Sequence, residues 1–193
     1  MRHMGFRRFR RPPTFRPPVF PRCRPLRFRQ VPVVDAEDLD AVAQQLGREP
    51  RGVLEIAYRC PNGQPAVVKT APRLPDGTPF PTLYYLTHPA LTAAASRLES
   101  SGMMRDMTER LADDPELAAA YLRAHESFLA ERDAVESLGT TFSGGGMPDR
   151  VKCLHALVAH SLAVGRGINP IGDRAVDSLG DYFRGRTPCA RLG

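Results

Sequence analysis

Residues 52–87 read GVLEIAYRCPNGQPAVVKTAPRLPDGTPFPTLYYLT, and the pattern within them sets the fold class. Apolar side chains alternate with others along residues 52–60, which is typical of a strand with one buried face. The turn sequences CPNG and LPDGT separate this strand from two further expected strands, residues 66–70 and 80–87. The simplest assembly is a three-stranded antiparallel meander. Because so small a sheet is not stable alone, helices must cover it.

Helical patterns occupy most of the remaining chain. One helix is expected between Asp35, a good N-cap, and Gly47, which ends it. The others are expected at residues 89–99, 103–111, 114–138, 148–164 and 173–182. We therefore predict a single α+β domain over residues 33–183, in which a small three-stranded antiparallel sheet packs on a mainly helical C-terminal half. Residues 184–193 are expected to fray.

The basic charge of the chain belongs to its N-terminal segment. Residues 1–30 hold ten arginines and no acidic residue, so the rest of the chain is slightly acidic. Repeated prolines and mutually repelling arginines predict that residues 1–32 form a disordered Arg/Pro/Phe-rich tail. This tail is either an inert extension, for instance an upstream stretch translated from an early start codon, or an arm for an anionic partner. The candidate partners are nucleic acid, polyphosphate and anionic lipid.

Two bulk features bear on the compartment. No apolar run approaches the ~18 residues of a membrane span, and the N-terminus lacks a secretory apolar region. We therefore expect a cytoplasmic protein without a transmembrane segment. Its four cysteines are scattered and form no CxxC pair, so we interpret them as thiols.

Residues 144–160, GGGMPDRVKCLHALVAH, concentrate the reactive side chains. On a helix beginning at Pro148, Cys153 and His160 would share the face opposite the core but stand ~10 Å apart in rise. Cys153 and His155 would point ~160° apart. The pair at helical spacing is Asp149 and Cys153.

These spacings leave two kinds of site open. A metal site could combine Asp149 and Cys153 with Cys60 from the first strand. Alternatively, Cys153 could be a nucleophile, because a helix N-terminus and neighbouring cations lower a thiol pKa. A histidine from elsewhere, His88 or His125, would then have to act as the base.

The glycines before the expected helix suggest a third kind of site. Backbone amides of Gly145 and Gly146 could hold a phosphate, with Arg150 and Lys152 adding positive charge. The stretch lacks the GK[ST] ending of a P-loop, and no strand precedes it. The alternative is a flexible loop between two helices.

Four runs of sequence resemble one family. They are RCPNG (59–63), TAPRLPDGTPFPT (70–82), GGGMPDRVKCLH (144–155) and NPIG (169–172). Together they are similar to a mainly actinobacterial family catalogued as domain of unknown function 501, over roughly residues 35–180. The resemblance implies a pattern that runs through Cys60, Arg73, Cys153 and His155. It implies no established activity or cofactor. Members are often encoded near a septum-formation initiator and an exopolyphosphatase-like enzyme, which implies a role around the cell envelope, division or polyphosphate.

Two functions follow as hypotheses. The first is a non-enzymatic accessory or interaction protein linked to cell division or polyphosphate metabolism, since no acid–base pair stands at a sensible spacing. The second is a small enzyme or metal-site protein centred on Cys153 and His155, with Cys60 and Arg73 as further candidates. Convergence of these side chains in one concave site would favour the second.

Overall fold

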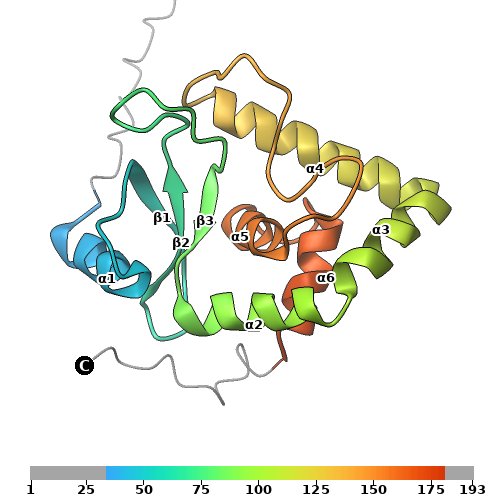
Figure 1. The fold of residues 1–193 in the computed structure, drawn as a ribbon, viewed down its shortest axis with the longest axis horizontal. Coiled ribbons are helices and arrows are strands. Elements are labelled where there is room, and N and C mark those ends of the chain that lie inside the picture. The colour runs from blue at the N-terminus through green and yellow to red at the C-terminus, as the bar shows by residue number, and fades with distance from the viewer. Residues whose placement is uncertain (1–33, 181–193) are drawn as a thin grey trace, which may run out of the picture. The chain divides into compact units, whose positions relative to one another are not determined.

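The computed structural model describes residues 34–180 (Figure 1). The expected tail at residues 1–32 and the expected frayed end at residues 184–193 lie outside this range. The strands are β1 (Val53–Arg59), β2 (Pro65–Thr70) and β3 (Tyr84–Leu86). The helices are α1 (Ala36–Leu46), α2 (Pro89–Ser100), α3 (Met103–Asp113), α4 (Pro115–Asp133), α5 (Leu154–Val164) and α6 (Pro170–Ser178). The α+β class is thereby confirmed. None of these helices has the length and apolar character needed to cross a membrane.

The sheet is the expected antiparallel meander, in the order β1-β2-β3. Its first strand departs from simple alternation, because the β1–β2 register shifts at three places between Val53 and Arg59. Each shift changes which side chains face inward, so residues 53–58 are all half-buried. The third strand is only three residues long, and its expected start at residues 80–82, which contains Pro81, lies outside the strand. Proline cannot donate to a ladder.

Helices cover both faces of the sheet (Figure 1). On one face α1 is tied to the strands by two contacts: Gln45 Nε2 donates to Pro65 O at 2.8 Å, and Arg59 Nη1 donates to Asp38 Oδ1 at 2.7 Å. On the other face lies α5, which contacts β3 more than the other two strands. Asp35 caps α1 and Asp114 caps α4, as their positions in the sequence predict.

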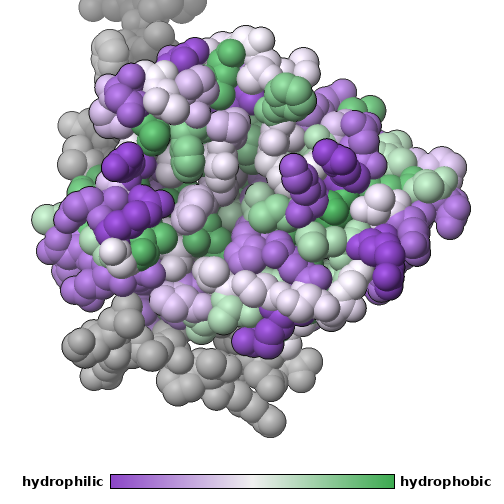
Figure 2. Space-filling model, in the orientation of Figure 1, coloured by the Kyte–Doolittle hydropathy of each residue, from purple (hydrophilic) through white to green (hydrophobic). Residues whose placement is uncertain are grey.

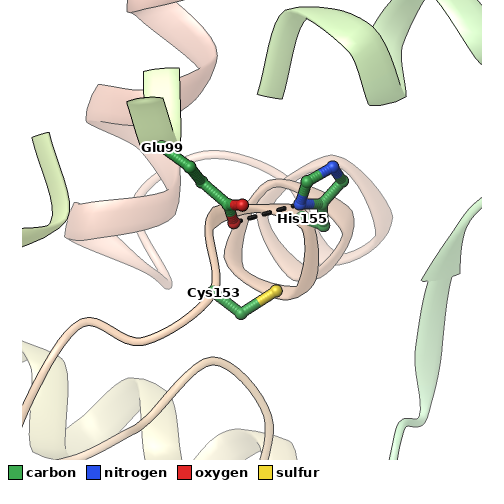
Figure 3. A group of neighbouring side chains, drawn as sticks. All are labelled: Glu99, Cys153 and His155. Carbon is green, nitrogen blue, oxygen red and sulfur yellow. Dashed lines mark hydrogen bonds and ion pairs between the residues drawn. The ribbon is translucent and has the colours of Figure 1, made fainter. Parts of the chain in front are cut away.

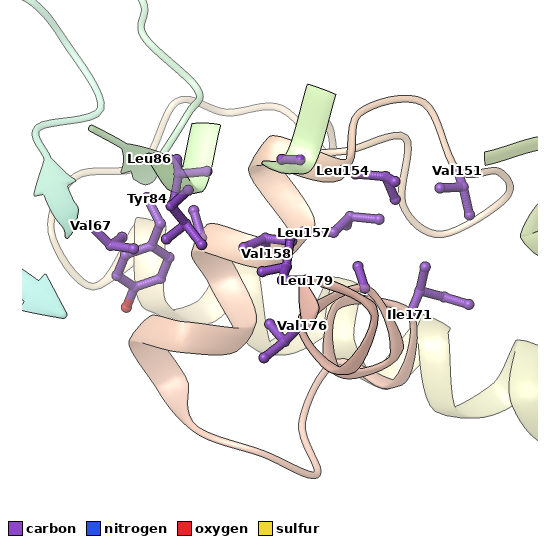
Figure 4. Close-up of a cluster of buried hydrophobic side chains, with 14 of the residues drawn as sticks. Val67, Tyr84, Leu86, Val151, Leu154, Leu157, Val158, Ile171, Val176 and Leu179 are labelled. Atoms are coloured by element: carbon purple, nitrogen blue, oxygen red, sulfur yellow. The ribbon is translucent and has the colours of Figure 1, made fainter. Parts of the chain in front are cut away.

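The core is organised around α5 (Figure 4). This helix packs against β3, α2 and α6, and its Leu154, Leu157 and Val158 are fully buried. The main cluster also includes Val67, Tyr84, Leu86, Val151, Ile171, Val176 and Leu179. A helix enclosed on several sides is apolar nearly all round, which explains why a single apolar stripe describes it poorly.

The start of α5 differs from the sequence-based expectation. The helix begins at Leu154, six residues after Pro148. The preceding amides have acceptors elsewhere: Val151 N donates to Thr108 Oγ1 at 3.0 Å, and Lys152 N donates to Gly145 O at 2.7 Å. Because these distant acceptors hold residues 150–153 in an irregular loop, Cys153 is the N-cap and stands outside the helix.

The described surface carries few large apolar side chains. Leu122, Val135, Phe142 and Ile168 are the large hydrophobic residues exposed within residues 34–180, and they belong to different segments. Figure 2 shows strongly hydrophilic side chains over α1 and over the α3–α4 end, with hydrophobic surface only in small separated areas. Such scattered residues do not mark a docking surface.

Candidate functional site

Glu99, Cys153 and His155 converge at the N-terminus of α5 (Figure 3). Glu99 comes from the last turn of α2, and His155 from the first turn of α5. One potential ligand atom from each side chain lies within 4.8 Å of the other two. The expected separation of Cys153 and His155 by ~160° is therefore wrong, since it assumed that both lie on the helix.

The His155 ring is oriented by hydrogen bonds at its Nε2 atom. This nitrogen lies 3.2 Å from Thr92 O and 3.2 Å from Ser96 Oγ. A carbonyl can only accept, and the Ser96 hydroxyl donates its own proton to Thr92 O at 3.1 Å. Both neighbours therefore accept from Nε2, which carries a proton and leaves Nδ1 facing Glu99.

Glu99 joins the helix N-terminus to the histidine. Its Oε1 accepts from Leu154 N at 2.7 Å and lies 3.0 Å from His155 Nδ1. The side chains of His155 and Glu99 are 26% and 24% exposed, so solvent still reaches the cluster. Sequence reasoning missed Glu99, because no local spacing connects α2 to α5. The only available signal was that it is the single acidic residue in residues 89–100.

Cys153 is not an acidified thiol. Burial raises its pKa above the ordinary value, and the nearby Glu99 carboxylate adds to this rise. The backbone N–H groups of Ala156 and His155 act in the opposite direction without overcoming burial. The expectation that the helix terminus and nearby cations lower this pKa is therefore not met. Cys153 is mainly a neutral thiol at pH 7.

Cys153 borders two hollows. The smaller, of about 300 Å³, is lined by residues that include Thr82, Tyr84, Thr92 and His155. The larger, of about 670 Å³, is lined by the glycine loop and by Asp149, Arg150 and Lys152. The Glu99–Cys153–His155 cluster is therefore reachable from concave surface.

The other metal and catalytic candidates lie apart from this cluster. Cys60 is only 3% exposed at the end of β1, within the hydrophobic core. Arg73 pairs with Glu136 at 2.9 Å and lines neither hollow. Asp149 lines the larger hollow with Cys153. Within residues 34–180, Glu99, Cys153 and His155 form the one group of three potential metal ligands.

The candidate phosphate residues lie together around the larger hollow. Gly145 and Gly146 have φ angles of 70° and 92°, which side-chain-bearing residues rarely adopt. Arg150 and Lys152 line the same hollow, and neither forms an ion pair within the described part of the chain.

His160 is placed differently from its expected position opposite the core, because it is fully buried. The Tyr84 ring stacks on it at 5.9 Å, and Phe128 meets it edge-on at 5.3 Å. Asn169 Nδ2 lies 3.1 Å from His160 Nδ1, while Asn169 Oδ1 accepts from Gly172 N. The Asn169 amide therefore donates to Nδ1, and the ring is neutral. Burial lowers the pKa of His160 to about 4.

This buried histidine predicts an acid-sensitive fold. The unfolded state binds a proton at His160 near pH 6.5, whereas the folded state does so near 4. The contribution of neutral His160 to the free energy of unfolding is therefore fully present above pH 6.5 and is lost as the pH falls below it. The loss is on the order of 2 kcal/mol between pH 7 and pH 5. Urea unfolding of His160→Asn, whose Oδ1 can replace Nδ1 as acceptor, should show a shallower fall. An unchanged pH dependence in this variant would contradict the assignment.

The fold and this cluster define an α+β protein with cysteine, histidine and glutamate side chains gathered at a helix N-terminus. The chain belongs to the family described as protein of unknown function DUF501, whose model matches residues 56–177. The resemblance seen in the sequence is thereby confirmed, and the matched region includes Glu99, Cys153 and His155. No curated protein and no solved structure matched the chain.

Proposed function

We propose that Glu99, Cys153 and His155 bind one divalent transition metal of the zinc class, and that the protein acts through this centre. The observation that carries the proposal is the convergence of three different ligand types within 4.8 Å. Thiolate, imidazole and carboxylate are the three protein ligands that zinc takes. This proposal keeps Cys153 and His155 from the sequence-based candidates and replaces Cys60, Asp149 and Arg73 by Glu99.

The surroundings of His155 support a ligand role. A metal-binding histidine usually donates its second ring N–H to a carbonyl or carboxylate, which fixes the ring and its tautomer. Thr92 O and Ser96 Oγ provide that support at Nε2, so Nδ1 is the ligand atom. An unprotonated Nδ1 facing the Glu99 carboxylate needs a cation between them. A proton gives an ion pair, and a metal ion gives a coordination site.

The required movement is small. Ligand atoms in a tetrahedral zinc site lie about 3.3–3.7 Å apart, given metal–ligand bonds of about 2.0–2.3 Å. Glu99 Oε1 and His155 Nδ1 lie 3.0 Å apart, and all the separations stay within 4.8 Å. The side chains of His155 and Glu99 are about a quarter exposed, which leaves them room to rotate.

Three protein ligands beside a hollow match a site that keeps a position for water or substrate. Bound there, a zinc-class ion would supply Lewis acidity. The centre also suits an accessory protein that senses or carries a metal. A role in cell division or polyphosphate metabolism stays a proposal that rests on the family resemblance alone.

The test uses cobalt(II) as a spectroscopic probe for zinc. The full-length, chelator-treated protein is titrated with cobalt, and thiolate-to-cobalt absorption is recorded. We expect one equivalent to bind, and an equivalent of zinc to displace it. Cys153→Ser should abolish the thiolate band. His155→Gln and Glu99→Gln should each weaken binding by at least about 10-fold, the lower range for losing even a supporting group.

The other cysteines provide matched controls. A chain with Cys23→Ser and Cys189→Ser, and a separate Cys60→Ala chain, should keep the cobalt band with unchanged stoichiometry. Ser96→Ala should weaken binding moderately, because it removes one of the two acceptors at His155 Nε2. A band that persists in Cys153→Ser, or no band in the wild type, would leave the cluster as an ion pair only.

A further inference from the structure

A second pair of reactive side chains, His125 and Ser143, lies beside the larger hollow, which Ser143 lines together with Cys153. His125 is on α4, and Ser143 is in the loop that joins α4 to α5 (Figure 1). Their Nδ1 and Oγ atoms are 2.8 Å apart. The hydroxyl also lies 3.5 Å from Met147 O, which is longer than a normal O–H···O bond. The closer atom, His125 Nδ1, accepts the Ser143 proton when the ring carries its own proton on Nε2. This is the distance at which a base accepts a proton from a nucleophile.

His125 is suited to accept that proton. The residue is only 8% exposed, and burial is the main cause that lowers its pKa below the ordinary value. Asp149 and Glu126 act to raise this pKa, whereas Arg132 lowers it further. The ring is therefore neutral at pH 7. Asp149, which lines the hollow, is placed to stabilise the imidazolium that forms when the proton arrives.

Arg132 fixes the loop segment that precedes Ser143. The guanidinium of Arg132, which is fully buried, donates to Phe142 O and, at 2.6 Å, to Thr140 O. These carbonyls lie one and three residues before Ser143. Because both donors belong to one rigid planar group, the backbone leading to Ser143 has little freedom, and preorganisation of this kind is what a nucleophile needs.

The hollow can receive a reacting group. Ser143 and the glycine loop line its 670 Å³, together with Arg150 and Lys152. The N–H groups of Gly144, Gly145 and Gly146 donate to no acceptor within residues 34–180. Such amides can stabilise the oxyanion that develops when a carbonyl is attacked. The two cations favour an acyl compound that carries a negative group.

We propose that Ser143 is a nucleophile activated by His125, and that it takes an acyl group from an anionic ester bound in the larger hollow. Ser143 Oγ forms a bond to the carbonyl carbon while its proton passes to His125 Nδ1. The ester C–O bond then breaks, and the departing alkoxide takes that proton and leaves as an alcohol. Water releases the acyl group as a carboxylic acid and restores the hydroxyl. No metal takes part in these steps, so the proposal does not depend on the Glu99–Cys153–His155 centre.

A fluorophosphonate probe on the full-length protein tests the pair. Attack by Ser143 Oγ forms an O–P bond, expels fluoride and transfers the proton to His125. We expect one adduct, located at Ser143 by peptide mass spectrometry. Ser143→Ala should remove it, and Ser137→Ala, an exposed serine of the same loop, should leave it unchanged. His125→Gln should slow labelling at least about 100-fold, the usual contribution of a general base.

A pH profile of the wild type covers the case in which His125→Gln does not fold. The charges facing His125 are Asp149, Glu126 and Arg132, with a net downward shift of its pKa. The labelling rate should therefore rise with pH until His125 is neutral. It should reach its plateau at a pH below 6.5, the ordinary pKa of histidine, and stay constant above that pH. A rate that keeps rising through neutral pH, an adduct elsewhere, or no adduct would overturn the proposal.

Two further experiments distinguish this site from the metal site and test the class of substrate. Chelator treatment should leave the labelling rate unchanged, so the metal proposal and this one can fail independently. A nitrophenyl ester of a dicarboxylic acid should protect Ser143 better than the matching neutral ester. Lys152→Gln should reduce that preference, and equal protection by the two esters in the wild type would contradict an anionic substrate.

Discussion

Replacing Arg132 with methionine is expected to lower the free energy of unfolding by about 3–5 kcal/mol, the range for removing one member of a buried charged network. Arg132 is fully buried, and its guanidinium donates to Thr140 O, Phe142 O and Asp133 Oδ1. Methionine keeps much of the side-chain volume but donates no hydrogen bond. The variant leaves two loop carbonyls without their donor, and each such loss costs about 1–3 kcal/mol when the group stays buried.

The effect of the planar guanidinium of Arg132 can be distinguished from the effect of its charge. Arg132→Lys keeps the charge but cannot bond both carbonyls with a planar group, so an intermediate loss is expected. Arg123→Met on the exposed side of the same helix is the matched control, with a change within about 0.5 kcal/mol. Urea unfolding at pH 7 measures all three. Equal stability of Arg132→Met and Arg123→Met would show that Arg132 does not hold the loop.

Gly172→Ala is expected to destabilise the protein by about 2–3 kcal/mol through overpacking. Gly172 lies in α6 where this helix crosses α5, and an added Cβ would stand 2.4 Å from Leu157 O and 2.9 Å from Ser161 Cβ. The nearer atom belongs to the backbone of a buried helix and cannot turn away. Alanine is a better helix former than glycine by about 1 kcal/mol, and the clash outweighs this gain.

Gly144→Ala supplies the comparison for Gly172. Its added Cβ would meet Ala156 and Phe128 at 3.5 Å, an ordinary contact distance. Its free energy of unfolding should therefore change by no more than about 0.5 kcal/mol. If Gly172→Ala is as stable as Gly144→Ala in urea unfolding, the helices are not held as closely as the structure places them.

Much of the fold was predictable because its signals are local. The alternating apolar residues and the turn residues predicted three strands, and the N-cap residues Asp35 and Asp114 predicted where two helices begin. The errors fall where distant groups intervene. Register shifts between β1 and β2 removed the expected alternation of Val53–Arg59. His160 was placed opposite the core because α5 was treated as having one apolar side, whereas neighbours enclose it.

The candidate site shows the same division between local and distant effects. Cys153 and His155 stood out as reactive types near an expected helix start, which is information carried by a few adjacent residues. Glu99 could not be added, because its approach depends on how α2 packs against α5. The His125–Ser143 contact likewise joins residues 18 positions apart through a loop that Arg132 holds.

The sequence by itself determined the α+β class, the antiparallel meander and the family to which the chain belongs. The tertiary structure decided where α5 begins. Thr108 and Glu99, which lie more than forty residues earlier in the chain, accept hydrogen bonds from the backbone N–H groups of Val151 and Leu154. As a result, the helix begins after Cys153. That displacement takes Cys153 off the helix and brings its side chain beside His155 and Glu99, because a residue at the N-cap is freed from the 100° step that separates neighbours within a helix.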